Sequence, residues 1–236
     1  MKDSVLIVGV GGLGVPAATA LARAGAHNFA LIDADPVELS NLPRQVIYGF
    51  GDIGAPKVAA AARRLAQVYP GARIETYQCE LAPANAVDLI SRHGFVIDAT
   101  DNPATKFLIN DTCLSTGRAF VYGGVLGLTG QAMSVIPGRT ACLRCLFEEP
   151  PDEAEIASCR EAGIIGPVAG VIGEVQADEA LHWIRGETLE LAGAILTYDG
   201  SNTARFRRTT VAARPGCRCG AARGHDGAAS LAPSTR

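Results

Sequence analysis

Aromatic side chains and net charge are both scarce in this chain. Phe, Trp and Tyr make up 6% of the 236 residues, and the formal net charge is −3 at a pI of about 5.8. A nucleic-acid-binding domain usually has a high pI and a clustered basic surface. The composition therefore gives no support to a nucleic-acid partner, and we expect none.

Long hydrophobic runs are also missing. The apolar run Val5–Val10 is soon interrupted by glycines and is too short for the core of a secretory signal. No stretch approaches the roughly 18 consecutive apolar residues of a membrane-spanning helix. The seven cysteines are odd in number and clustered. Without an export signal this favours metal or catalytic chemistry over disulfides, so we expect a cytoplasmic protein without membrane contact.

Glycine and small apolar residues are plentiful. The chain has 27 glycines and is 48% hydrophobic, which is enough for a sizeable core. Short apolar runs alternate with alanine-rich helical stretches, which is typical of a parallel sheet covered by helices. Strands are predicted at 4–8, 29–32, 73–77, 95–99, 119–123, 131–136 and 194–198, and helices at 15–24, 56–69, 105–116 and 168–185.

These elements predict one α/β domain over residues 1–220, doubly wound and Rossmann-like with a mostly parallel sheet. The strands at 131–136 and 194–198 are expected to form an antiparallel C-terminal extension. Residues 148–163 are polar and contain prolines, which predicts a loop. The tail at 221–236 is small, polar and aperiodic, and we expect it to be disordered.

A glycine turn lies between the first predicted strand and the first predicted helix, with the sequence GVGGLG at residues 9–14. Glycines let the backbone approach phosphate, and the helix N-terminus adds N–H donors and a favourable dipole. Asp33 ends the next strand, about 20 residues beyond the last glycine, where it can hydrogen-bond a ribose hydroxyl. The motif predicts a nucleotide site but does not separate NAD from ATP.

A second polar cluster follows Asp33 and argues against NAD. Asn41, Arg44 and Gln45 come just after the ribose-binding strand, and Lys57 begins the next predicted helix. Arg offers a planar fork to phosphate oxygens and Lys a compact charge, so the pair suits a triphosphate. For Lys57 taken alone, a solvated helix surface is the competing interpretation.

Two cysteine pairs predict a metal site. Cys142 and Cys145 have the C-x-x-C spacing of a zinc half-site. Cys217 and Cys219 would supply the second half, although their C-x-C spacing is one residue shorter. We expect a structural zinc site with these four cysteines as ligands, and four reduced cysteines of a lost site are the alternative.

Together these motifs resemble the ThiF/MoeB/HesA family, relatives of the ubiquitin-activating enzymes. The resemblance rests on GVGGLG, on DADPVELSNLPRQ at 33–45, on GAPK at 54–57 and on DATDN at 98–102. It continues through CLRC at 142–145, CREAG at 159–163, GPV at 166–168 and VIG at 171–173. It covers nearly the whole chain except the tail.

The resemblance implies roles for these residues. The implied ATP-binding residues are Gly9, Gly11, Gly12, Gly14, Asp33, Asp35, Asn41, Arg44, Lys57, Asp101 and Asn102. Asp101 is the implied Mg²⁺ ligand, and its place just after a buried strand, at the carboxyl edge of the sheet, supports this independently. A turn or helix-cap aspartate is the competing interpretation.

The resemblance also implies a reaction. The enzyme would adenylylate the C-terminal glycine of a small ubiquitin-like sulfur-carrier protein ending in Gly-Gly, using ATP and releasing pyrophosphate. Arg44, Lys57, Asp101 and Cys159 are the implied catalytic residues. In the thiamine branch the cysteine matching Cys159 forms a covalent link with the carrier, and the CREAG and GPV motifs place this chain nearer that branch than the molybdopterin branch. A homodimer and a sulfurtransferase or cysteine desulfurase partner are expected.

Other interpretations stay open at this point. Family members usually carry an arginine ahead of the first strand, and Met1–Ser4 contains none, so a nucleotide-binding scaffold with weakened catalysis is one alternative. A family member that activates a non-carrier substrate is another. An NAD-dependent oxidoreductase is the last, and it leaves Arg44, Lys57, Asp101 and the cysteine pairs unexplained.

Overall fold

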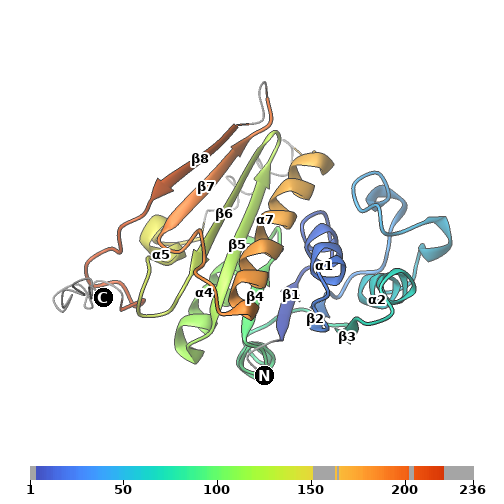
Figure 1. Cartoon of the computed structure of the whole chain (residues 1–236), viewed down its shortest axis with the longest axis horizontal. Coiled ribbons are helices and arrows are strands. Elements are labelled where there is room, and N and C mark those ends of the chain that lie inside the picture. Colours follow the sequence, from blue (N-terminus) through green and yellow to red (C-terminus); the bar gives the residue numbers. More distant parts are fainter. Residues whose placement is uncertain (1–3, 151–162, 164, 202–204, 221–236) are drawn as a thin grey trace, which may run out of the picture.

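The computed structural model describes residues 4–150, 163, 165–201 and 205–220. Within them the chain forms an eight-stranded sheet in the order β3-β2-β1-β4-β5-β6-β7-β8, with helices on both faces (Figure 1). The strands are β1 (Val5–Val8), β2 (Asn28–Ile32), β3 (Arg73–Tyr77), β4 (Phe95–Asp98), β5 (Ala119–Leu126), β6 (Thr129–Val135), β7 (Ala194–Asp199) and β8 (Arg205–Thr210).

The helices alternate with the parallel strands along the chain. They are α1 (Gly14–Arg23), α2 (Lys57–Val68), α3 (Ala86–Ser91), α4 (Pro103–Thr116), α5 (Leu143–Leu146) and α7 (Gly166–Arg185), with short 3-10 turns η1 (Leu39–Asn41) and η2 (Phe50–Asp52). The first five strands of the chain pair in parallel, and β6, β7 and β8 follow beyond β5, each antiparallel to the strand before it. The predicted fold class is thereby confirmed.

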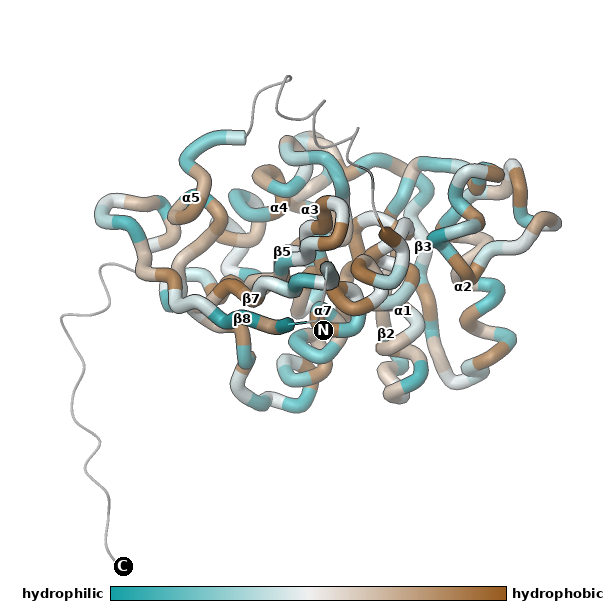
Figure 2. Tube along the Cα trace, turned by 90° about the horizontal axis from the view of Figure 1, so that it is seen from above, coloured by the Kyte–Doolittle hydropathy of each residue, from teal (hydrophilic) through white to brown (hydrophobic). Residues whose placement is uncertain are grey.

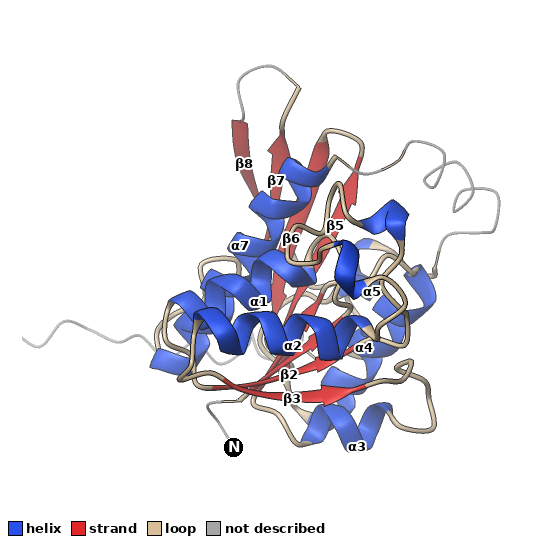
Figure 3. Ribbon diagram, turned by 90° about the vertical axis from the view of Figure 1, so that its right-hand side faces the viewer, coloured by secondary structure: helices blue, strands red, loops and turns tan. Residues whose placement is uncertain are grey.

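The sheet separates two hydrophobic cores. One packs α1, α2 and α7 against one face of the strands, and the other packs α3, α4 and α5 against the opposite face. Figure 3 shows α1 and α2 on one side of β2 and β3, with α3 on the other. Because β1 is covered on both faces, Val5–Val8 is buried throughout, which explains its continuous apolar sequence.

Helix α4 begins two residues before its predicted start. The side chain of Asn102 accepts hydrogen bonds from the backbone N–H groups of Ala104 and Thr105, and Pro103 follows at the first helical position. An Asn cap followed by Pro is a strong local start signal. The helix ends at Thr116 and is followed by Gly117, which has a left-handed φ of 67°.

Three short elements were not predicted. Strand β8 has the sequence RFRRTT, and every residue in it is exposed, because it is the outer edge of the sheet. It therefore lacks the alternation that marks a half-buried strand, and Figure 2 shows it as hydrophilic. Helices α3 and α5 have 6 and 4 residues, too few for a helical period to show. The predicted loop at 148–163 and the tail at 221–236 lie almost entirely outside the described residues.

Candidate functional site

The glycine turn leaves β1 at the carboxyl edge of the sheet and enters α1. Gly9 has a φ of 91°, and a Cβ there would lie 2.7 Å from the carbonyl oxygen of Ala99. A Cβ on Gly14 would overlap the Gly9 carbonyl oxygen. Only glycine fits these two positions. Gly11 and Gly12 are half-buried, and a Cβ on either would meet no atom closer than ordinary contact distance. The backbone of these two residues is therefore the part of the turn that a ligand can reach.

Asp33 ties the end of β2 to this turn. Its carboxylate accepts a 2.7 Å hydrogen bond from the Val10 N–H and a 2.9 Å bond from the Asp35 N–H. The buried Tyr48 hydroxyl donates to the Val10 carbonyl oxygen at 2.9 Å. Burial, together with Asp33 and Asp52, raises the Tyr48 pKa above its usual value, so the hydroxyl stays a donor. Sequence reasoning missed Tyr48, which lies in an irregular segment without a motif.

Lys57 begins α2 and forms an ion pair with Asp35. Its ammonium lies 2.7 Å from the Asp35 carboxylate, and the Lys57 side chain is 9% exposed against 67% for Asp35. The competing interpretation of Lys57 as a solvated surface residue is therefore wrong. A nearly buried ammonium that pairs with an exposed carboxylate can reorient toward a more highly charged anion.

The segment around η1 carries the other predicted polar residues. The Asn41 side chain accepts from the Glu38 N–H at 3.1 Å and so shapes the turn. Arg44 is half-buried, and its guanidinium donates to the Ser40 carbonyl oxygen at 2.7 Å. A Cβ on Gly166 would lie 3.3 Å from the Arg44 Cβ, which places Arg44 beside the start of α7.

Gln45 is a polar group that received no role from the sequence. It is 3% exposed, and its amide oxygen has no hydrogen-bond partner among the described residues. A Cβ on Gly11 would lie 3.5 Å from its amide nitrogen. A buried polar atom without a partner beside the glycine turn favours a ligand or water at this position.

The loop after β4 holds the predicted Mg²⁺ ligand. Asp101 is exposed, as expected for a residue that meets a ligand from solvent. Asn102 caps α4 with its side-chain oxygen, so in this structure it acts as a helix cap. Asp98, earlier in the same motif, is entirely buried and pairs with Lys106, a contact that the sequence did not predict.

These groups gather at one edge of the sheet because β2, β1 and β4 are neighbours in it. Their carboxyl ends carry Asp33, the glycine turn and Asp101, and Lys57 joins them through Asp35. In open α/β sheets, ligands bind outside the carboxyl ends of the strands. The arrangement suits a phosphorylated nucleotide, with cations and backbone N–H groups facing its phosphates.

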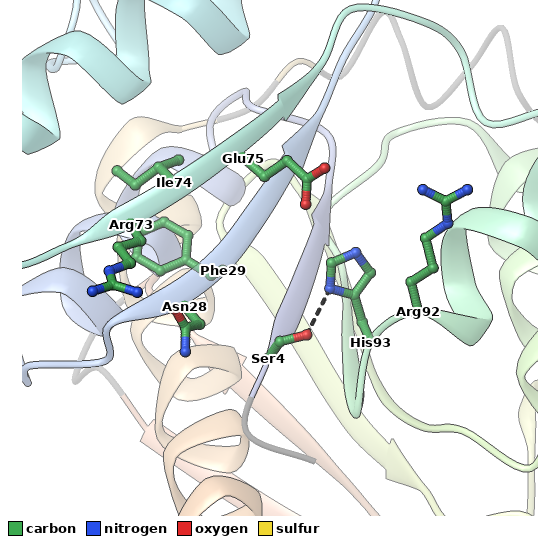
Figure 4. Close-up of a pocket in the computed structure, with 8 residues that line it drawn as sticks. All are labelled: Ser4, Asn28, Phe29, Arg73, Ile74, Glu75, Arg92 and His93. Carbon is green, nitrogen blue, oxygen red and sulfur yellow. Dashed lines mark hydrogen bonds between the residues drawn. The ribbon is translucent and has the colours of Figure 1, made fainter. Parts of the chain in front are cut away.

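The opposite edge of the sheet has a separate hollow of about 360 Å³ (Figure 4). It lies at the amino ends of β1, β2 and β3 beside α3, and none of the predicted nucleotide-binding residues lines it. The buried His93 ring shares a 2.8 Å hydrogen bond with the Ser4 hydroxyl there, and Arg73, Arg92 and Glu75 surround it. Burial lowers the His93 pKa, which keeps the ring neutral.

The four predicted metal ligands do come together. The sulfur atoms of Cys142, Cys145, Cys217 and Cys219 all lie within 4.8 Å of one another. The Cys142–Cys217 and Cys145–Cys219 sulfur distances are 3.7 and 3.6 Å. A tetrahedral ion with Zn–S bonds of about 2.3 Å separates its sulfur ligands by about 3.8 Å. The donor set and spacing therefore fit zinc despite the short C-x-C half-site.

Cys159 lies outside the described residues, so its covalent role stays a prediction from the sequence. Among the described residues, no helix has the length and apolar character to cross a membrane.

Comparison with known proteins places these features in a family. A sequence profile of the ThiF family matches residues 1–220. The sulfur carrier protein adenylyltransferase of Thermus thermophilus is 39% identical over 221 residues, covering 92% of this chain and 81% of its own. The adenylyltransferase and sulfurtransferase MOCS3 of Anopheles gambiae is 40% identical over 203 residues, covering 86% of this chain. This chain spans about half of that protein, 46%.

Solved structures agree on the fold. The crystal structure of E. coli MccB with ATP superposes with a TM-score of 0.80, covering 92% of this chain and 66% of that chain. Its sequence identity is 19%, so the likeness concerns the fold alone.

Proposed function

Because this chain belongs to the ThiF family, we propose that it uses ATP to adenylylate the C-terminal glycine of a small ubiquitin-like sulfur-carrier protein. Its enzyme class is that of the adenylyltransferases, the class named for both relatives. The observation that supports the proposal most is the convergence of the glycine turn, Asp33 and the Lys57–Asp35 pair at the carboxyl edge of the sheet.

The chemistry is attack by a carboxylate oxygen of the carrier on the α-phosphorus of ATP. A carboxyl–phosphate bond forms, the α–β phosphoanhydride bond breaks, and pyrophosphate leaves with both electrons of that bond. The attacking carboxylate is already ionised, so no general base is needed. Lys57 and Arg44 would neutralise phosphate charge, and the glycine-turn backbone would hold the chain of phosphates. Asp101 would hold a Mg²⁺ ion, which supplies further charge neutralisation.

The finer identity of the carrier is a separate part of the proposal. We favour a thiamine-type carrier over a molybdopterin-type carrier, because of the CREAG motif at 159–163 and the GPV motif at 166–168. A sulfurtransferase or cysteine desulfurase would then deliver sulfur to the adenylylated glycine. The cysteine cluster would hold a structural Zn²⁺ ion, and the protein would work in the cytoplasm.

Carrier-dependent ATP–pyrophosphate exchange tests this function. Purified protein is assayed with individual carriers ending in Gly-Gly and with the same carriers lacking the last glycine. We expect exchange with one intact carrier and a loss of roughly 10²–10³-fold in Arg44→Ala or Asp101→Ala, as for removal of one charge-stabilising group. Measurable ATP binding without exchange with any carrier would instead favour a nucleotide-binding scaffold.

We also propose that the protein is a homodimer, on the evidence of exposed apolar side chains before and at the end of α2. They are Val46, Phe50 and Ile53 in the segment before α2, which are 82%, 78% and 46% exposed, and Val68 at the end of α2, which is 67% exposed. Figure 2 shows hydrophobic segments in the loop beside α2. Contiguous exposed apolar surface usually marks a contact with another protein, and a second copy is the partner that is always present.

Phe50→Asp is expected to convert the dimer to monomers at micromolar concentration. Loss of an aromatic anchor typically costs about 2 kcal/mol or more, which is roughly 30-fold in the dissociation constant. Sedimentation velocity measures the change, and Val87→Asp on α3, another exposed apolar site, is the control. A wild-type protein that sediments as a monomer would contradict the proposed dimer.

A further inference from the structure

Lys106 forms a buried ion pair beside the candidate nucleotide site. Its ammonium lies 3.2 and 3.4 Å from the two carboxylate oxygens of Asp98. The Asp98 side chain is fully buried and the Lys106 side chain is 13% exposed. Taking two charges out of water is unfavourable unless further hydrogen bonds satisfy them. The remaining partners of this pair therefore indicate what it holds in place.

The Lys106 ammonium also binds strand β5. It donates a 2.5 Å hydrogen bond to the Gly123 carbonyl oxygen and lies 4.9 Å from the centre of the Tyr122 ring. On the other side of the sheet, Gln176 of α7 donates to the backbone carbonyl oxygen of Asp98 at 2.6 Å. A Cβ on Gly123 would lie 2.5 Å from the Gln176 side chain. The end of β4, the first turn of α4 and the middle parts of β5 and α7 are thus joined around one ion pair.

The same ion pair fixes the loop that carries Asp101. Asp98 accepts hydrogen bonds from the Thr100 N–H at 3.1 Å and from the Thr100 hydroxyl at 2.7 Å. On the far side of Asp101, Asn102 caps α4, the helix from which Lys106 projects. Asp101 is therefore an exposed residue between two anchored neighbours, and the position of its carboxylate depends on both anchors.

We infer that Lys106 is a positioning residue that holds the Asp101 carboxylate in a fixed position relative to strand β5. The inference rests on the proposed function, in which Asp101 holds Mg²⁺ beside ATP. Lys106 acts through Asp98 and the Thr100 turn, because its ammonium is held by Asp98 and by the Gly123 carbonyl oxygen. Partners that orient a metal ligand typically change metal affinity or activity by 10- to 100-fold when they are removed.

The test is a double-mutant cycle in which Mg²⁺-dependent ATP binding is measured by calorimetry. Lys106→Met alone leaves Asp98 buried and unpaired, so the Asp98→Asn/Lys106→Met variant, which removes both charges, is made as well. We expect this variant to need roughly 10- to 100-fold more Mg²⁺ for the same ATP affinity. Because Lys106 acts through Asp101, adding both changes to Asp101→Ala should produce little further loss. Lys106→Arg, which keeps the charge, should restore part of the Mg²⁺ dependence.

The control is the exposed ion pair between Asp88 of α3 and Arg92, which follows that helix. Asp88→Asn/Arg92→Met also removes one pair of opposite charges, at the other edge of the sheet, and should leave Mg²⁺ dependence unchanged. A folded Asp98→Asn/Lys106→Met variant with wild-type Mg²⁺ dependence would overturn the inference, and so would losses that add fully to those of Asp101→Ala. If wild-type protein binds Mg²⁺ and ATP but shows no carrier-dependent exchange, the proposed function is refuted. The role of Lys106 is then still tested by the double-mutant cycle on Mg²⁺-dependent ATP binding.

Discussion

Lys57→Met is expected to lower carrier-dependent ATP–pyrophosphate exchange by roughly 10²–10³-fold, with the protein still folded. The lysine ammonium is a compact charge at the start of α2, held at the carboxyl edge by Asp35. Methionine keeps the unbranched apolar stem of a side chain that is 9% exposed. The carboxylate that it leaves behind is 67% exposed, so water solvates Asp35 and the free energy of unfolding changes little.

Two variants check that the missing charge is the cause. Asp35→Asn keeps the ammonium and removes only its partner, so it should lose less exchange activity than Lys57→Met. Lys57→Arg keeps the charge but alters its geometry, and partial activity is expected because a guanidinium does not place its charge where an ammonium does. Full exchange by Lys57→Met at saturating ATP would mean that the triphosphate lies elsewhere, whatever the carrier.

The ion pairs of Lys57 and Lys106 differ in how deeply the carboxylate partner is buried. Lys57 has an exposed partner, and its ammonium can exchange that partner for phosphate. Lys106 has a fully buried partner in Asp98 and a backbone carbonyl at 2.5 Å, so its ammonium is fixed. We therefore expect Lys57 to act on the nucleotide and Lys106 to act on the framework that surrounds it.

The parallel half of the fold follows closely from local sequence. Strand β3 has the predicted bounds, and β1, β2 and β4 begin or end within one residue of them. Strands β1, β2 and β4 are short apolar runs, so their burial on both faces can be predicted from composition. Strand β3 lies at the sheet edge and is RIETY, with alternating apolar and polar residues. Edge strand β8 was not predictable in the same way, because its pairing with β7 leaves all its side chains in solvent.

The site residues that belong to a sequence motif could be predicted, whereas the contacts between distant segments could not. The glycine turn follows from local sequence, since a strand, a turn and a helix place it directly, and each cysteine pair is marked by its own short spacing. The pairing of Lys57 with Asp35 joins residues 22 positions apart, and Gln176 reaches Asp98 across 78 positions. Such contacts depend on how helices cross the sheet, which a single sequence does not specify.

Loss of the metal at the cysteine cluster is expected to lower the melting temperature by at least roughly 10 °C. Cys142 and Cys217 lie 75 positions apart, so an ion shared by them closes a long loop and joins α5 to the segment after β8. A structural zinc site contributes several kcal/mol to the free energy of folding directly. In a chain of this size, each kcal/mol lost lowers the melting temperature by roughly 2–4 °C. Natively purified protein should contain one zinc per chain by elemental analysis.

Cys217→Ser should reproduce the effect of a chelator, and Cys79→Ser is the matched control. Cys79 is also a free, half-buried cysteine, but it lies outside the cluster, so its replacement should leave both zinc content and melting temperature nearly unchanged. The antiparallel strands β7 and β8 should loosen first, because the cluster anchors the chain after β8 and these strands form the sheet edge. ATP binding should persist below the new melting temperature, since β2, β1 and β4 lie in the other half of the sheet. Protein that contains no zinc, with Cys217→Ser melting at the wild-type temperature, would show that the four thiols pack together without a metal.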